Sequence, residues 1–119
     1  MPREGLAYLS DIVEACEAIS SAIHGLDLVS YESNRLVRSS VEREFIIIGE
    51  AIAALARHAP ELFARITQAR RAVDFRNLLA HEYATVDDAI VWAIADRGVP
   101  VLRSECEALM ARILQGETD

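Results

Sequence analysis

Glycine and proline are scarce in this chain of 119 residues, which contains 5 glycines and 3 prolines. Because both residues interrupt helices, their scarcity together with abundant Ala, Leu, Glu and Arg favours helices over sheets. No stretch has the composition of a linker or of a low-complexity tail, and no internal repeat is visible. We therefore predict one all-α domain over residues 1–119, a length sufficient to bury a core of its own.

The sequence also lacks cysteine motifs, a secretory start and long apolar runs. Its two cysteines, Cys16 and Cys106, lie far apart on apolar stripes, which predicts reduced cysteines in the core. The first residues do not combine a positive charge with an apolar run, and the longest uncharged apolar stretches, 45–49 and 89–95, are too short to span a bilayer. We expect a cytoplasmic protein with no membrane partner.

Lysine is absent, and all 12 basic residues are arginines against 19 acidic residues, giving a net charge of −7. The basic residues are not spread evenly, because residues 65–76 contain four arginines and only one acid, a local charge of +3. Arginine binds phosphate through two parallel hydrogen bonds. A small basic segment on an acidic protein predicts a localised anion site and argues against a broad surface that coats nucleic acid.

Apolar residues that recur at steps of three and four predict the first two long helices. The first stripe consists of Leu6, Leu9, Val13, Cys16, Ile19 and Ile23, and the second of Val37, Val41, Phe45, Ile48, Ile52 and Leu55. We predict one helix that ends near Gly25, a loop over residues 25–34, and a second helix that begins at Ser33 or Asn34 and runs to about His58. Ile46 and Ile47 add apolar surface on a second side, so this helix needs a further neighbour, either a helix or another subunit.

The second half of the chain is predicted to contain a short helix over residues 61–66 and a helix over about residues 72–83. Residues 85–88, Thr-Val-Asp-Asp, have the form of a capping box for a last helix that starts near Asp87 and runs towards Leu114. Gly98 and Pro100 should kink or split that helix, and Gly116 should end it. The fold class is thus an up-down bundle of four main helices plus a short helix.

One predicted helix carries chemically reactive groups. On an ideal helix Arg76, Asn77, His81 and Tyr83 share a polar sector of roughly 160°, whereas Phe75, Leu78 and Leu79 form the apolar side. A guanidinium can neutralise charge on a phosphodiester in its transition state, and an imidazole can transfer a proton near neutral pH. The spacing alone fits equally a histidine that caps a helix or is merely exposed. Clustered carboxylates that would hold two metal ions are absent, so we expect no metal and no cofactor.

The pattern Arg76-Asn77-x-x-x-His81-x-Tyr83 resembles the Arg-x4-His-x-Tyr signature of the HepT-like toxins, a branch of the HEPN superfamily of helical ribonucleases. Residues 45–51, Phe-Ile-Ile-Ile-Gly-Glu-Ala, resemble the Ile-Ile-Gly-Glu-Ala stretch of that family, and residues 11–15 and 88–92 also match its habits. The resemblance therefore covers about residues 6–114, with the segments in the same order and at the same spacing as in the family. It implies a HEPN-like bundle.

The resemblance further implies a metal-independent endoribonuclease that acts as a homodimer, with Arg76 and His81 as catalytic residues. The ribose 2′-hydroxyl would attack the neighbouring phosphate and leave a cyclic phosphate and a 5′-hydroxyl. A homodimer agrees with the residues, because one motif histidine cannot easily serve as both acid and base whereas two chains supply two. We expect an RNA substrate and no DNA partner.

HepT-like toxins are paired with a small nucleotidyltransferase antitoxin in type VII-like toxin-antitoxin systems, and this partner uses ATP to attach AMP to the motif tyrosine. The resemblance implies that AMPylation falls on Tyr83 in this chain. The added phosphate would occupy Arg76 and repel RNA. A tyrosine that packs its ring at a helix end is the alternative.

Other residues and functions remain open from the sequence. Asn77 is a supporting residue, and Glu50 is predicted either to orient Arg76 or His81 across the bundle or to face solvent. Arg70 and Arg71 either guide RNA or form a solvated surface pair. The alternative functions are a non-catalytic HEPN-fold module that binds a nucleotide or a partner protein, which the acidic net charge favours, and a structural helical dimer.

Overall fold

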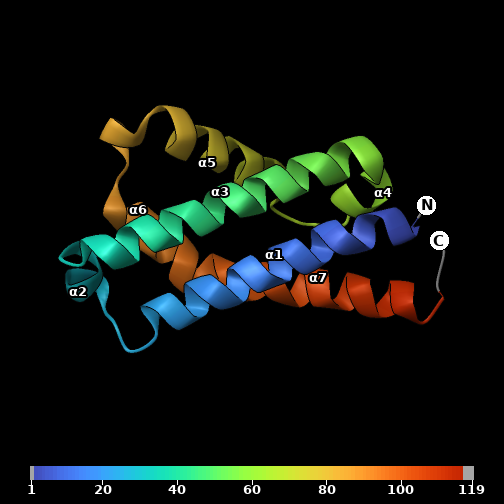
Figure 1. The fold of residues 1–119 in the computed structure, drawn as a ribbon, viewed down its shortest axis with the longest axis horizontal. Coiled ribbons are helices and arrows are strands. Elements are labelled where there is room, and N and C mark those ends of the chain that lie inside the picture. The colour runs from blue at the N-terminus through green and yellow to red at the C-terminus, as the bar shows by residue number, and fades with distance from the viewer. Residues whose placement is uncertain (1, 117–119) are drawn as a thin grey trace.

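The computed structural model describes the backbone of residues 2–116 and, within that range, all side chains except those of residues 2–4 and 83. The described chain is helical, with short connections between the helices (Figure 1). The elements are α1 (Pro2–Ile23), α2 (Leu28–Glu32), α3 (Arg35–His58), α4 (Pro60–Phe63), α5 (Ala69–His81), the 3-10 helix η1 (Tyr83–Thr85), α6 (Asp88–Ala93), the π-helix η2 (Ile94–Gly98) and α7 (Val99–Leu114). The prediction of an all-α fold is confirmed.

The long helices alternate in direction, as predicted for an up-down bundle. α1 packs against α3 and α7, whereas α5 runs antiparallel to α3 along its outer side (Figure 1). The molecule measures 45 × 29 × 19 Å, so it is a slab of packed helices. α5, from the same chain, is thus one further neighbour of α3.

The core lies where α1, α3 and the end of α7 meet. Its fully buried side chains include Leu9, Cys16, Ile19, Val41, Ile52, Leu55 and Cys106 from the predicted stripes, and Ile12 in place of the predicted Val13, which is only partly buried. Burial of an aliphatic side chain contributes roughly 1.5–3 kcal/mol, so these stripes account for most of the packing. Both cysteines are free, as predicted, and burial raises the pKa of each thiol to about 12.

The predicted loop over residues 25–34 is wrong in part, because it contains α2. Asp27 caps this helix by accepting a hydrogen bond from the Ser30 backbone N–H at 2.9 Å, and the Ser30 hydroxyl accepts one from the Asp27 N–H. The Ser30 backbone N–H, and then the Ser30 hydroxyl, donate hydrogen bonds to the Asp27 carboxylate and hold its pKa below the ordinary value. A helix of five residues is too short to show periodicity, and its capping box is the signal that marks it.

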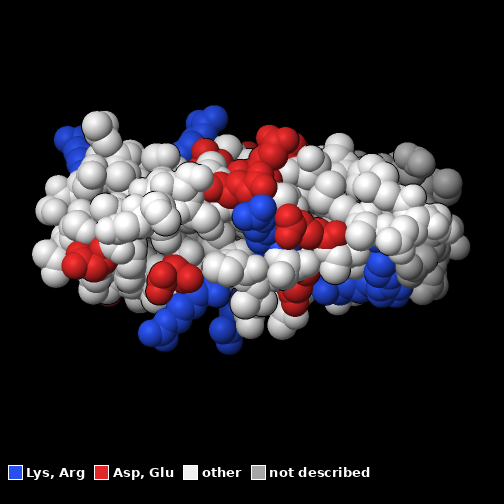
Figure 2. Space-filling model, turned by 90° about the horizontal axis from the view of Figure 1, so that it is seen from below, with Lys and Arg blue, Asp and Glu red and all other residues white. Residues whose placement is uncertain are grey.

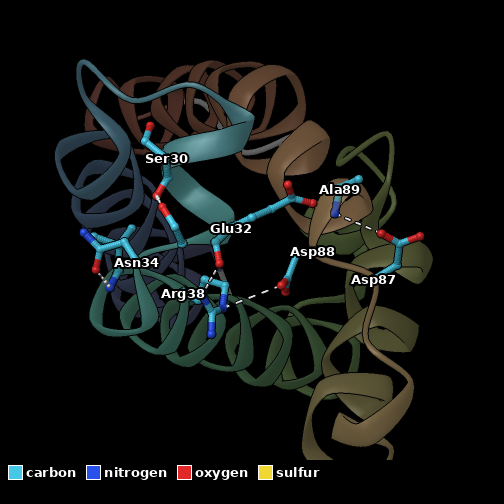
Figure 3. A network of polar contacts seen from close by, with 9 residues as sticks. Ser30, Glu32, Asn34, Arg38, Asp87, Asp88 and Ala89 are labelled. Atoms are coloured by element: carbon cyan, nitrogen blue, oxygen red, sulfur yellow. Dashed lines mark hydrogen bonds and ion pairs between the residues drawn. The ribbon is translucent and has the colours of Figure 1, made fainter.

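The corner between α2, α3 and α6 is held by polar contacts (Figure 3). Arg38 on α3 donates to the Glu32 carbonyl oxygen and lies 3.6 Å from the Asp88 carboxylate at the start of α6. Asp87 caps α6 by accepting from the Ala89 N–H at 2.9 Å. The predicted capping box over residues 85–88 is therefore wrong, since the Thr85 hydroxyl donates to the carbonyl of Glu82 instead.

The last predicted helix is interrupted, but by a π-helical turn. Residues Ile94–Gly98 form η2, and Pro100 lies in the first turn of α7, where its missing N–H has no cost. Helix α7 ends before Gly116, which adopts a φ of +85° as expected for a helix stop. None of the described helices combines the length and the apolar character that crossing a bilayer requires.

Candidate functional site

The site is built on α5, and α5 is fixed by a close approach to α3 at Gly49. An added Cβ at Gly49 would lie 2.2 Å from Arg76 Cβ and 3.1 Å from the carbonyl oxygen of Ala72. No side chain larger than hydrogen fits there without a shift of the α5 backbone. Because position 49 has no side chain, α5 can lie close against α3, and this close contact fixes the position of Arg76.

A second contact holds the start of α5. The Thr67 backbone N–H donates to Glu105 on α7 at 3.3 Å, and the Thr67 hydroxyl donates to the other oxygen of the same carboxylate. Gln68, the residue before α5, makes no side-chain capping bond. Glu105 thus anchors the loop that leads into α5, and its negative charge lies close to the amino end of that helix, where it is favourable.

The guanidinium of Arg76 is held by two groups. Its Nη1 donates to Asn77 Oδ1 at 2.8 Å, and its Nη2 donates to Glu50 Oε2 at 3.3 Å. The Arg76 side chain is 32% exposed, so it remains accessible to an anion from solvent. Glu50 both contacts Arg76 and faces solvent, with 57% of its side chain exposed. The two supporting residues predicted from sequence thus lie beside the predicted catalytic arginine.

One nitrogen of Arg76 is unsatisfied. Its Nε is buried and has no hydrogen-bond partner in the described structure. A buried donor without a partner costs about 1–3 kcal/mol. The Arg76 side chain therefore contributes less to stability than a fully hydrogen-bonded arginine would. Such incomplete satisfaction is common at functional sites, where a side chain is placed to bind a ligand.

His81 is the last residue of α5, and its side chain is exposed. It lies five positions after Arg76 on the same helix, and neither side chain is sealed inside the bundle. An exposed imidazole at a helix end can exchange protons with solvent or with a substrate. The geometry thus keeps a cation and a proton-transfer group on one helix that borders solvent.

The predicted helix over residues 72–83 is wrong at both ends. α5 begins three residues earlier and ends at His81, because Glu82 leaves the helical region with ψ near 39°. Tyr83 lies in η1 and therefore does not continue the polar sector of an ideal helix. Its side chain lies outside the part of the chain that the structure describes, so its orientation towards Arg76 stays a prediction.

A different arginine shows how charges are used elsewhere in this chain. Arg103 on α7 binds Glu17 of α1 at 2.7 Å and Glu107 at 3.3 Å. Figure 2 shows the molecule from below, with acidic side chains gathered in the middle of the face around a basic group. Among the described residues, no three His, Cys, Asp or Glu side chains are grouped to hold a metal ion.

Sequence reasoning missed Gly49 as a structural determinant and missed the contact between Thr67 and Glu105. A glycine inside an otherwise regular helical stripe is the signal that could have found the first, because such a glycine often marks a close backbone approach. The second joins residues 38 positions apart and leaves no local pattern.

Comparisons with known proteins place this chain in a family of ribonucleases. The family described as Ribonuclease HepT-like matches residues 12–109. A protein of Methanocaldococcus jannaschii named as a candidate RNase is 30% identical over 105 residues, which cover 88% of this chain and 95% of that protein. A protein of Thermococcus cleftensis with the name "Probable ribonuclease HepT" is 29% identical over 112 residues, which cover 92% and 98% of the two chains.

No solved structure matches the chain. The family match spans most of the described helices, including the whole of α3 and α5, and the relatives align over nearly their full length. The resemblance to the HepT-like family is therefore confirmed over residues 12–109. This protein belongs to the HepT-like ribonuclease family.

Proposed function

We propose that this protein is a metal-independent endoribonuclease, the toxin of a type VII-like toxin-antitoxin pair. The observation that carries the proposal is Arg76, held over Gly49 by Glu50 and Asn77, and followed on the same helix by the exposed His81. The family match and the ribonuclease names of the relatives support this reading.

In the proposed reaction the ribose 2′-hydroxyl attacks the adjacent phosphorus, and the bond to the 5′-oxygen of the next nucleotide breaks. Arg76 stabilises the charge that grows on the phosphoryl oxygens. His81 accepts the 2′-hydroxyl proton or donates one to the departing 5′-oxygen. The products are a 2′,3′-cyclic phosphate and a 5′-hydroxyl, and no atom of a metal ion takes part.

Asn77 and Glu50 act as positioning residues for Arg76. In the free protein each occupies one terminal nitrogen of the guanidinium, which fixes the plane of this group. A phosphate is a stronger partner than a half-exposed carboxylate at 3.3 Å, so substrate displaces Glu50 from Arg76. Glu50 therefore keeps the empty site ordered without blocking it.

The proposal includes a homodimer, because two copies supply two histidines for the acid and the base. It also includes control by a small nucleotidyltransferase that attaches AMP to Tyr83. Tyr83 follows the last turn of α5, two positions after His81. A phosphate on this residue would add negative charge at the end of the helix that carries Arg76 and so repel RNA.

The test is cleavage of single-stranded RNA by the purified protein in excess EDTA. The wild type should cut the RNA and leave cyclic-phosphate ends, while His81→Ala should lose activity by about 100-fold or more. His24→Ala, which changes an exposed histidine in the turn after α1, is the control and should cut normally. Normal cleavage by His81→Ala would remove His81 from the mechanism.

The second candidate function is a non-catalytic module that binds a nucleotide or a partner. It is favoured by the net charge of −7 and by Glu82 within the motif. In that case Arg76→Ala would weaken nucleotide binding while the wild type cuts no RNA. The cleavage assay above separates the two functions.

A further inference from the structure

A groove of about 490 Å³ lies between α5 on one side and η2 with the first half of α7 on the other. Phe45 and Ile48 of α3 line it from below, and Phe75 and Leu102 line its two sides. Most of the lining is apolar. Pockets that hold small organic ligands have volumes of roughly 300–1,000 Å³, so this groove suits one ring system with its substituents.

The rim of the groove is basic although the protein is acidic. Arg71 of α5 and Arg97 of η2 both line it, and both are exposed. Neither forms an ion pair with any residue that the structure describes. The one carboxylate among the lining residues, Glu105, has both oxygens occupied by Thr67. An occupant that is apolar and flat in the middle and anionic at its ends complements this surface.

The groove and the Arg76 site lie on adjoining parts of one helix. Arg71 and Phe75 are one turn apart on α5, and Arg76 directly follows Phe75. The guanidinium of Arg76 reaches Glu50 on α3, while Phe75 lines the groove towards α7. A helix is roughly 10 Å across, so a chain molecule that crosses α5 can occupy both places.

We propose that this groove binds an unpaired base of single-stranded RNA, at a nucleotide that flanks the phosphate held by Arg76. Arg71 and Arg97 contact phosphates on either side of that base. The proposal rests on the proposed function for its substrate class, and it adds a preference for unpaired RNA, because a base in a duplex cannot enter the groove.

The aromatic content of the groove favours a base over other occupants. Phe45 and Phe75 meet edge to face with their centroids 5.2 Å apart, and Phe75 remains partly exposed. Proteins that bind single strands combine such rings with basic side chains that follow the phosphates. A second copy of this chain is the alternative occupant, and the oligomeric state of a groove variant distinguishes it from RNA.

The experiment uses a fluorescent, fully 2′-O-methylated single-stranded oligonucleotide, which lacks the free 2′-hydroxyl and cannot be cut. Val101 lines the groove and is 57% exposed, so Val101→Trp fills the groove without disturbing the core. Val29→Trp is the matched control, because Val29 is 73% exposed on α2 and does not line the groove. A second pair of variants is the double change Arg71→Ala with Arg97→Ala, and Arg57→Ala as an exposed arginine elsewhere.

We expect Val101→Trp to weaken binding about tenfold, as loss of one stacked base does, and Val29→Trp to bind like the wild type. Abasic sites in the oligonucleotide should weaken binding to the wild type but not to Val101→Trp. The double arginine change should lower the salt dependence of binding by roughly 1.4 in log–log slope, at about 0.7 for each phosphate contact.

Three outcomes would overturn the groove proposal: wild-type protein that does not bind the oligonucleotide, unchanged binding by Val101→Trp, or conversion of a wild-type dimer to a monomer by Val101→Trp in light scattering. The last would assign the groove to a second copy of the chain. The nuclease proposal is tested separately: it fails if the wild type does not cut an unmodified RNA. Binding that depends on the groove without any cleavage would therefore retain the groove and reject the nuclease.

Discussion

Arg103 and Arg76 have similarly exposed side chains, at 38% and 32%, but opposite surroundings. Arg103 pairs its Nε with Glu107 and its Nη2 with Glu17, so it joins α7 to α1 through two carboxylates. Arg76 has one carboxylate at 3.3 Å, an amide from its own neighbour and a buried Nε with no partner. The difference shows that one arginine is used to hold helices together and the other is left incompletely satisfied.

The largest difference between the two arginines should appear in RNA cleavage when each guanidinium is removed in turn. Arg76→Ala should reduce RNA cleavage about 100- to 1,000-fold, because charge on the phosphoryl oxygens loses its stabilising cation. Arg103→Ala should leave cleavage unchanged and lower the free energy of unfolding by less than about 1 kcal/mol, as expected for exposed ion pairs. Single-turnover kinetics and urea denaturation measure the two effects. Equal loss of activity in both variants would erase the distinction between the two arginines.

Next in size is the change at the α3–α5 crossing. Gly49→Ala forces a methyl group to within 2.2 Å of Arg76 Cβ, so α5 must shift and the free energy of unfolding should fall by about 1–3 kcal/mol. Cleavage should fall as well, because Arg76 moves with α5. Gly98→Ala is the control for stability alone, since its nearest contact is an ordinary 3.5 Å to Ile94 Cγ2 but Gly98 lines the groove. If Gly49→Ala folds and cleaves like the wild type, the close approach does not position Arg76.

A smaller effect should come from neutralising the carboxylate beside each arginine. Glu50→Gln removes the charge that competes with phosphate for Arg76, so an uncleavable RNA should bind up to about fivefold more tightly. Glu107→Gln makes the same change beside Arg103 and should leave RNA affinity as it is. Fluorescence anisotropy at one fixed salt concentration gives both constants. Weaker binding by Glu50→Gln would mean that Glu50 contributes to the RNA site directly.

The smallest effect concerns a third arginine, Arg38, which pairs with Asp88 and leaves Glu42 without a hydrogen-bonded partner among the described residues. Burial, and then the charge of Asp88, raise the pKa of Glu42 above its ordinary value. The folded protein therefore holds this proton more tightly than the unfolded chain, and stability falls as the pH rises through the raised pKa. At neutral pH, ionised Glu42 lowers stability.

Glu42→Gln should accordingly raise the free energy of unfolding at pH 7 by less than about 1 kcal/mol. The gain should shrink as the pH falls and vanish below the ordinary carboxyl range near pH 4.3, where Glu42 is protonated in both states. Urea titrations at several pH values test this. A gain that is the same at pH 4 and pH 7 would show that it does not come from the charge of Glu42.

The sequence predicts α1 and α3 within a few residues, because long apolar stripes and the Asn34 cap mark them clearly. The sequence does not predict where α5 ends, because neither glycine nor proline follows His81. Glu82 ends the helix through its backbone conformation. The early start of α5 is hidden for a similar reason, since Gln68 forms no capping bond. Local signals mark helix ends only where a side chain makes the cap.

The site shows the same division between local and long-range information. Arg76, Asn77 and His81 can be found from their spacing on one helix. The placement of Glu50 against Arg76 could be stated only as one of two alternatives, because it depends on how α5 lies on α3. The groove beside Phe75 left no trace in the sequence, since its lining residues come from three segments that meet only in the folded protein.

The π-helical turn Ile94–Gly98 has a consequence for insertions and deletions. A π turn contains one residue more than an α turn, and each residue turns a helix by roughly 100°. Deleting one residue there would remove the extra residue and restore a regular helix, while the residues that follow keep nearly the same rotation about the helix axis. Cys106, Leu109 and Ile113 would then stay in the core, so a one-residue deletion should be better tolerated at this turn than inside α7, where it would rotate the buried face by about 100°.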